Sequence, residues 1–173
     1  MSGDLRWTIC ESPLGPLTAV AGPAGIRNLF FAGSAPRLPE AARRPMPEVA
    51  SQLDAYFAGE RRSFDLDLDL RGAPLQLRVW AELGEIPYGT TTTYGQLAAR
   101  IASSDFPVGL EPYERVRRVG AEIGRTPTPI LVPCHRVIGA DGSLTGYGGG
   151  LERKRQLLAL EAEVAAGFRA TLW

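Results

Sequence analysis

The amino-acid sequence predicts an α/β (α+β) fold, with a small N-terminal α/β unit followed by a mostly helical C-terminal domain. Three observations support this. Short runs of β-branched and aromatic residues fill the first third of the chain. An amphipathic helix and a strictly alternating stretch come next, and the second half then changes to helical periodicity. The change falls near residues 71–75, so we expect two domains, residues 1–72 and residues 73–173.

The first unit is expected to begin with three strands, "WTICES", "LTAVAG" and "IRNLFFAG", because Pro- and Gly-rich turns separate them. A helix is expected in "PEVASQLDAYFAGE", ending near Gly59. Its apolar face consists of Val49, Leu53, Tyr56 and Phe57. The stretch "SFDLDLDL" then alternates, which predicts an edge strand with a solvated aspartate face. Its apolar face consists of Phe64, Leu66, Leu68 and Leu70.

Helical spacing marks the segments that open the second half. The stripe in "PLQLRVWAELGEIP" consists of Leu75, Val79, Leu83 and Ile86. The next segment, "TTTTYGQLAARIA", begins with threonines that favour an N-cap. In "EPYERVRRVGAEIGR" the valines and Ile123 share one face, and the outer positions are Arg115, Arg117 and Arg118. These two short helices resemble a helix-turn-helix, whose second helix enters a DNA groove; an ordinary solvated helix pair is the alternative.

Composition narrows the class of protein. The formal net charge is zero, but residues 100–155 carry nine Lys or Arg against six acidic residues, which weakly favours a polyanionic partner. No apolar run reaches about 18 residues, and the N-terminus lacks the features of a signal peptide. We therefore expect a cytoplasmic protein without a membrane partner. The two cysteines and one histidine cannot supply the four ligands of a structural zinc, so we expect no metal and free thiols.

The single histidine directly follows one of the two cysteines, in "PILVPCHRVIGADG". The pair Cys134–His135 could be a reactive thiol with its base, half of a metal site, or part of an inert buried turn. The preceding run, Ile130 to Val132, is expected to be buried and extended and to end at Pro133. His135 and Arg136 are both groups that favour a thiolate.

A carboxylate near the C-terminus offers a third member. In "GGLERKRQLLALEAEV", Glu161 shares a helical face with Leu151, Leu157 and Leu158. A carboxylate on a core-facing stripe is costly unless it is paired, and His135 is its natural partner. Cys134, His135 and Glu161 then have the residue types of a nucleophile, a base and an orienting group. The alternative is that Glu161 lies in water at a frayed helix end.

These residues also carry a family resemblance. The stretch "PCHRVIGADGSLTGYGGGLERKRQLLALE" closely resembles the active-site region of O6-alkylguanine-DNA alkyltransferases, and the resemblance continues through "RVWAELGEIPYGTTTTYGQLA" and "RVRRVG". It extends more loosely to "SPLGPLTAVAG" and "LDAYFAGERRSFDLDLDL", and so covers nearly the whole chain. The resemblance implies an RNase H-like N-terminal unit and a helical domain that binds DNA and accepts the alkyl group.

The resemblance also implies a function. Sulfur would take the alkyl group from O6 of guanine as a thioether, once per molecule and without a cofactor. The implied catalytic residues are Cys134, His135, Glu161 and Tyr94. In the implied guanine site, the N–H of Gly148 contacts O6 and the carbonyls of Cys134 and Val137 accept from the exocyclic amine. Tyr147 and Trp80 match pocket and supporting positions.

The implied partner is double-stranded DNA that contains O6-alkylguanine, bound by a monomer or by several copies along the DNA. Arg117 matches the arginine that replaces the rotated base, and the further implied DNA contacts are Arg115, Arg118, Arg136 and Tyr94. Two features depart from the family, Thr126 in place of an asparagine and a long segment over residues 103–111. An alkyl acceptor for another nucleic acid or for a small alkylated molecule is the alternative function.

Overall fold

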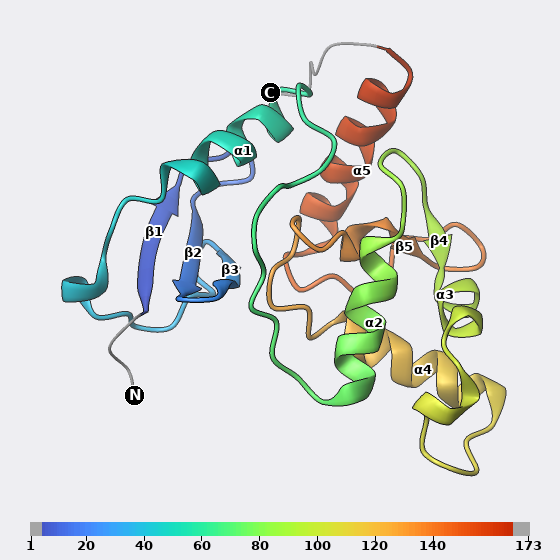
Figure 1. The fold of residues 1–173 in the computed structure, drawn as a ribbon. Helices are drawn as coiled ribbons and strands as arrows, with labels where there is room; N and C mark the ends of the chain where they lie inside the picture. Colours follow the sequence, from blue (N-terminus) through green and yellow to red (C-terminus); the bar gives the residue numbers. More distant parts are fainter. Residues whose placement is uncertain (1–4, 168–173) are drawn as a thin grey trace.

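The computed structural model describes residues 5–167 and begins with an antiparallel sheet (Figure 1). The strands pair in the order β1-β2-β3, and they are β1 (Arg6–Cys10), β2 (Leu17–Gly22) and β3 (Gly25–Phe31). Residues 11–16 join β1 to β2, and a tight turn joins β2 to β3, where Gly25 has a φ of 137°, a conformation that glycine adopts readily. The three strands expected from the sequence are confirmed.

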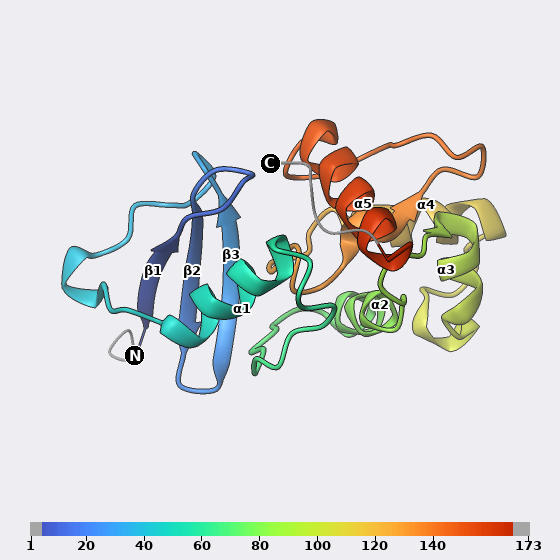
Figure 2. The ribbon, with the colours of Figure 1, turned by 90° about the horizontal axis from the view of Figure 1, so that it is seen from above.

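Helix α1 (Pro47–Phe57) packs against this sheet (Figure 2), after a short 3₁₀ turn, η1 (Glu40–Ala42). Pro47 occupies the first helical position, where its missing N–H needs no partner. The buried residues of α1 are the predicted four, Val49, Leu53, Tyr56 and Phe57. The amphipathic pattern therefore identified both the helix and its inner face.

The edge strand expected over residues 63–70 is not present, because this segment does not form a strand. It forms one isolated bridge, between Leu68 and Ile26, with Ile26 N donating to Asp67 O at 2.8 Å and Asp69 N donating to Ile26 O at 2.9 Å. Farther along β3, Leu29 N donates to Pro127 O at 2.9 Å, so a residue of the C-terminal half is bonded to that edge at Leu29. The alternation still sorts the faces correctly, since the apolar residues of the segment pack against the cores.

The C-terminal part consists of helices and one short parallel strand pair. The helices are α2 (Pro74–Gly84), α3 (Tyr94–Arg100), α4 (Pro112–Ile123) and α5 (Leu151–Ala165). The short 3₁₀ turns are η2 (Ser103–Asp105) and η3 (Cys134–Arg136), and the paired strands are β4 (Thr92–Thr93) and β5 (Val137–Ile138). Helix α3 begins with the expected threonine cap: Thr93 Oγ1 accepts from Gln96 N at 3.2 Å. Within residues 5–167, none of the helices is long and apolar enough to cross a membrane.

Two hydrophobic cores meet where the Cys134 turn lies. The first joins the sheet and α1 to Ile130, Leu131 and the inner face of α5, and the second joins α2, α3 and α4 to Cys134 and Val137. The inner face of α5 differs from the expected one, because Leu151 is exposed and Leu158 is only partly buried. Its buried residues are Lys154, Leu157, Leu160, Glu161 and Val164. Sheet, α1 and α5 therefore share one core around the expected site.

Candidate active site

The chain reaches Cys134 through a tight buried turn. Residues 130–132 are buried as expected but are not extended, because Val132 N donates back to Thr128 O at 2.9 Å. Ile130 has a φ of 75°, a left-handed conformation that is rare and costly for a β-branched residue. The surrounding core holds it there, and the chain continues directly into the 3₁₀ turn η3. Successive side chains of this turn consequently have different surroundings.

Glu161 is the centre of a buried network. Its Oε1 accepts from His135 Nε2 at 2.8 Å, from Arg136 Nη2 at 2.9 Å and from the Tyr56 hydroxyl at 2.8 Å. Its Oε2 accepts from Arg136 Nε at 2.8 Å and from Gly89 N at 3.1 Å. The structure thus brings His135 and Glu161 together as the sequence predicted, and Glu161 does not lie in water at a frayed helix end.

These contacts determine where the His135 proton lies. Burial alone would raise the pKa of Glu161, but the hydrogen bonds and charges of His135 and Arg136 outweigh burial and hold it at about 2. An ionised carboxylate can only accept, so Nε2 of His135 must carry a proton. Burial lowers the pKa of His135, although Glu161 raises it, and the lowered pKa favours the neutral ring. Nδ1 then carries a lone pair, and it is buried without a hydrogen-bond partner among the described residues.

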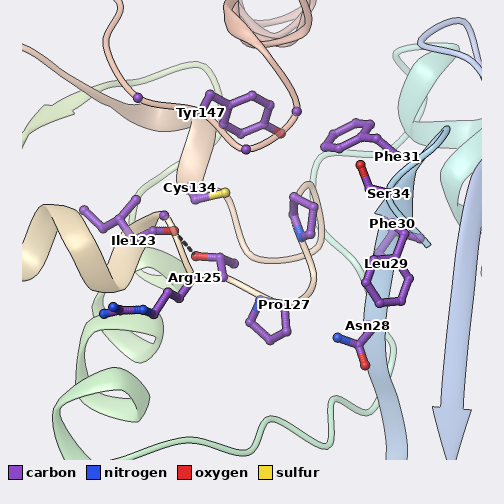
Figure 3. Close-up of a pocket in the computed structure, with 16 residues that line it drawn as sticks. Asn28, Leu29, Phe30, Phe31, Ser34, Ile123, Arg125, Pro127, Cys134 and Tyr147 are labelled. Atoms are coloured by element: carbon purple, nitrogen blue, oxygen red, sulfur yellow. Dashed lines mark hydrogen bonds between the residues drawn. The ribbon is translucent and has the colours of Figure 1, made fainter. Parts of the chain in front are cut away.

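The Cys134 side chain lines a cavity of about 320 Å³ between the two halves of the molecule (Figure 3). In Figure 3 its sulfur points into the cavity, with Tyr147 on one side and Phe31 across from it. Apart from Cys134, the lining comes from β3 and Ser34, from the end of α4 and the residues that follow it up to Pro129, and from residues 146–149. Glycines dominate the last segment, so backbone groups can approach a ligand closely there.

The thiol is buried, and its surroundings differ from those expected. Burial raises the pKa of Cys134, while a side-chain hydrogen bond with Thr126 and the charge of Lys154 lower it. Arg136, expected to favour the thiolate, is turned toward Glu161 instead. Thr126 also closes the end of α4, where its hydroxyl donates to Ile123 O at 2.7 Å (Figure 3). Thr126, the residue that departs from the family pattern, therefore closes the helix end and also affects the pKa of the thiol.

Lys154 is a site residue that the sequence reasoning missed. It is fully buried on α5, and its Nζ donates to Val137 O at 2.5 Å and to Thr145 O at 2.9 Å. It thereby ties the loop before Tyr147 to the strand after Cys134. One signal was available: it is the single lysine among nineteen basic residues, three positions before the core residue Leu157.

The implied guanine contacts have different positions. Gly148 and Tyr147 line the cavity, whereas Val137 is buried and its carbonyl already accepts from Lys154. The expectation that Trp80 belongs to the guanine site is corrected, because Trp80 does not line the cavity. Its Nε1 donates to Glu122 O at 3.0 Å inside the helical core. The Tyr94 hydroxyl donates to Thr145 O at 2.9 Å, next to the cavity loop.

The implied DNA-binding arginines also divide into groups. Arg117 is exposed on α4, and no hydrogen bond or ion pair involves its side chain within the described range. Arg118 is exposed and forms an ion pair with Glu122 at 3.1 Å. Arg115 holds the 103–111 segment, since it donates to Leu110 O at 3.1 Å and to Ser103 Oγ at 2.8 Å and lies over the Phe106 ring. The outer face of α4 therefore leaves Arg117 available.

Arg136 was expected to contact DNA, and the structure corrects this expectation. Its guanidinium is buried, forms two hydrogen bonds with Glu161, and donates from Nη1 to Ile86 O at 2.6 Å. The group also lies over the Tyr88 ring. Because a bidentate arginine–carboxylate pair fixes both partners, Arg136 anchors Glu161 inside the protein and does not reach the surface.

The arrangement has the parts of an assisted nucleophile. A thiol faces a cavity, the neighbouring imidazole has an unprotonated nitrogen, and a buried carboxylate fixes the ring. The cavity wall offers aromatic rings, prolines and glycine backbone, which suit a flat apolar ligand. This chemistry fits the displacement of a group from a heteroatom by sulfur.

Comparisons with known proteins agree over nearly the whole chain. A family model for the 6-O-methylguanine DNA methyltransferase ribonuclease-like domain matches residues 5–70, and a model for the DNA binding domain of that family matches residues 74–163. A methylated-DNA–protein-cysteine methyltransferase of Mycobacterium tuberculosis is 44% identical, over 91% of this chain and 92% of the relative. One from Methanosarcina barkeri is 41% identical, over 91% and 97%.

Solved structures are similar as well. The crystal structure of a Mycobacterium tuberculosis O6-methylguanine methyltransferase has a TM-score of 0.78 at 42% identity, covering 92% of this chain and 93% of that one. The crystal structure of Mycobacterium tuberculosis OGT in complex with DNA has a TM-score of 0.75 at 43% identity, with the same coverage. Both the expected fold class and the expected family are confirmed. The chain belongs to the 6-O-methylguanine DNA methyltransferase family.

Proposed function

We propose that this protein repairs DNA by moving an alkyl group from O6 of guanine to Sγ of Cys134. The observation that carries the proposal is the cavity-facing thiol beside a buried His135–Glu161 pair. The names of the relatives, methylated-DNA–protein-cysteine methyltransferases, support the same reaction. An alkyl ether of guanine is unactivated, so it needs a soft and strong nucleophile, and a thiolate is one.

Proton transfer starts the reaction. Glu161 keeps the proton on Nε2 of His135, and Nδ1 takes the thiol proton of Cys134, directly or through a water. The sulfur then attacks the alkyl carbon in line with the bond to O6. The S–C bond forms, the C–O6 bond breaks, and guanine leaves with the electron pair and receives a proton. Glu161 stabilises the imidazolium while it exists.

Recognition of guanine involves the cavity loop. The Gly148 N–H reaches O6, the carbonyls of Cys134 and Val137 accept from the exocyclic amine, and Tyr147 forms a wall. Val137 O has a second lone pair besides the one that Lys154 uses. Tyr94 donates toward the guanine ring, which requires its hydroxyl to leave Thr145 O when DNA binds.

The DNA surface is the outer face of α4. A base inside a duplex must be extruded before sulfur can reach it, and this costs a few kcal/mol. Arg117 has a free side chain in the part of the chain that the structure describes, and it fills the gap that the base leaves. Arg118 adds charge toward the phosphates, and the 103–111 segment, which Arg115 fixes, shapes the contact with the duplex. Added salt therefore weakens binding.

The product limits each molecule to one reaction. A thioether is not hydrolysed by any base in the site, so Cys134 stays alkylated and the protein is consumed. The protein acts as a monomer, with several copies able to line up along DNA. A reduced thiol and a DNA substrate both suit the cytoplasm.

The test is a titration of duplex DNA that contains O6-methylguanine. Restored guanine should rise to one equivalent per protein and then stop, and Cys134→Ser should restore none. A second arm offers methylated RNA and the free base O6-methylguanine at equal concentrations. Continued turnover would refute the single-use mechanism, and a faster reaction in the second arm would refute duplex DNA as the substrate.

A further inference from the structure

Tyr56 reaches the centre of the active site from the N-terminal unit. It lies on α1, 105 residues before Glu161, and its hydroxyl donates to Glu161 Oε1 at 2.8 Å in a buried contact. The same oxygen accepts from His135 Nε2 at 2.8 Å. A residue of the sheet-and-helix half therefore shares one carboxylate oxygen with the imidazole that the proposed transfer uses.

The Tyr56 hydroxyl is a permanent donor at this position. Burial first, and then the nearby charge and hydrogen bond of Glu161, raise the pKa of Tyr56 well above its ordinary value. The hydroxyl therefore keeps its proton across the working pH range. A donor on a carboxylate oxygen draws negative charge toward itself, so less of that charge is left for the imidazole proton. It also fixes the plane of the carboxylate.

The other charged groups near Glu161 do not duplicate the contact that Tyr56 makes with Oε1 alone. The other titratable groups around the pair are Arg136 on the same turn, Lys154 on α5, Cys134, Tyr88 and Tyr147. Arg136 contacts both oxygens of Glu161 and orients the carboxylate as a whole. Tyr56 adds a donor to Oε1 alone, the oxygen that His135 uses.

We propose that Tyr56 is a positioning residue for alkyl transfer, which holds Oε1 of Glu161 and limits how strongly that oxygen binds the imidazole proton of His135. This inference rests on the function proposed above. It gives the N-terminal unit a part in the reaction, because the unit supplies one of the donors on the carboxylate. Without Tyr56, Glu161 would bind the imidazolium more tightly, and protonated His135 would lose its proton less readily.

The molecule contains a matched control. The Tyr88 ring lies 6.0 Å from the Tyr56 ring between centroids, and the Tyr88 hydroxyl is buried with no hydrogen-bond partner among residues 5–167. Tyr56→Phe and Tyr88→Phe make the same chemical change at neighbouring sites. Both keep their rings, so the packing of Tyr56 against Phe57 and Phe64 is preserved. Only Tyr56→Phe removes a donor from Glu161.

The experiment observes His135 directly, because it is the single histidine in the sequence and a tag-free protein gives one imidazole spectrum. In Tyr56→Phe, we expect the hydrogen-bonded Nε2 proton to move downfield and the imidazole pKa to rise by about half a pH unit. The acidic limb of the transfer rate should move up with it, and Tyr88→Phe should match the wild type. Duplex affinity should stay unchanged in both variants.

Several results would overturn the proposal. One is an unshifted imidazole in Tyr56→Phe; another is a rate that falls equally at every pH, which would mean a purely structural role. If Tyr56→Phe does not fold, the wild type still offers a test, since the absence of a nuclear Overhauser contact between the Tyr56 hydroxyl proton and the His135 Nε2 proton would overturn the proposal as well. A failure of the repair function would appear as an inactive wild type and leave the imidazole measurement independent.

Discussion

Replacing Glu161 with glutamine should cost both stability and reactivity, for separate reasons. Glutamine keeps the shape of the side chain but removes the charge that faces Arg136, and its NH₂ cannot accept the bonds that one carboxylate oxygen accepts now. Breaking a buried ion pair by removing one partner costs about 3–5 kcal/mol. Domains of this kind are stable by about 5–15 kcal/mol in total, so Glu161→Gln should remain folded at low temperature but melt earlier.

The transfer rate should fall further in Glu161→Gln than the loss of folded protein alone would explain. In serine proteases, converting the orienting carboxylate to an amide lowers the rate by about 10⁴-fold, and the geometry here is analogous. Duplex affinity should hardly change, because Glu161 is buried and away from the outer face of α4. The assay combines urea unfolding, single-turnover transfer, and duplex binding followed by fluorescence anisotropy, all at a temperature where the variant is folded.

The pH dependence provides an internal check. The folded pKa of Glu161 is about 2 against an ordinary 4.5, so its ionisation stabilises the fold above pH 4.5, and this is lost as the pH falls toward 2. The stability gap between wild type and Glu161→Gln should narrow over that interval. Equal losses of transfer and of duplex binding would refute the reasoning and leave Glu161 with a structural role only.

Three further predictions concern DNA and protons. Arg117→Ala should slow repair in duplex DNA but barely affect the free base O6-benzylguanine, which needs no extrusion; equal losses would place Arg117 in the scaffold of the site. Shortening residues 103–111 should weaken duplex binding and leave the free-base reaction nearly intact, as gel-shift and free-base assays on one preparation can check. Because burial lowers the pKa of His135 from 6.5, the transfer rate should stay flat below pH 6.5 before it falls; an acidic limb above that pH would contradict the neutral imidazole.

Patterns that depend on burial could be predicted from the sequence. Helices α1, α2 and α4 and the three strands follow from spacing, because the core selects apolar residues at the period of the element. The pairing of Glu161 with His135 follows from the cost of an unpaired buried carboxylate. In each case the physical cause acts along one element or on one side chain, so the sequence records it.

Features that depend on a partner far along the chain could not be predicted. Alternation over residues 63–70 records which side faces the core, but not that Pro127 already occupies the edge of β3. The left-handed Ile130 contradicts local preference and is held by its surroundings. Arg136 lies beside the thiol in sequence, yet the 3₁₀ turn directs it to Glu161. The sequence pattern identified Tyr56 only as a core residue, because the partner of its hydroxyl, Glu161, is 105 residues away.

The location of the alkyl group after repair tests the central claim most directly. After complete reaction with a methylated duplex, the protein is digested and its two cysteine peptides are weighed by mass spectrometry. The proposed mechanism predicts one methyl on the peptide that contains Cys134, none on the peptide that contains Cys10, and none on either peptide of Cys134→Ser. A methyl on Cys10, or repaired DNA beside an unmodified Cys134, would contradict it.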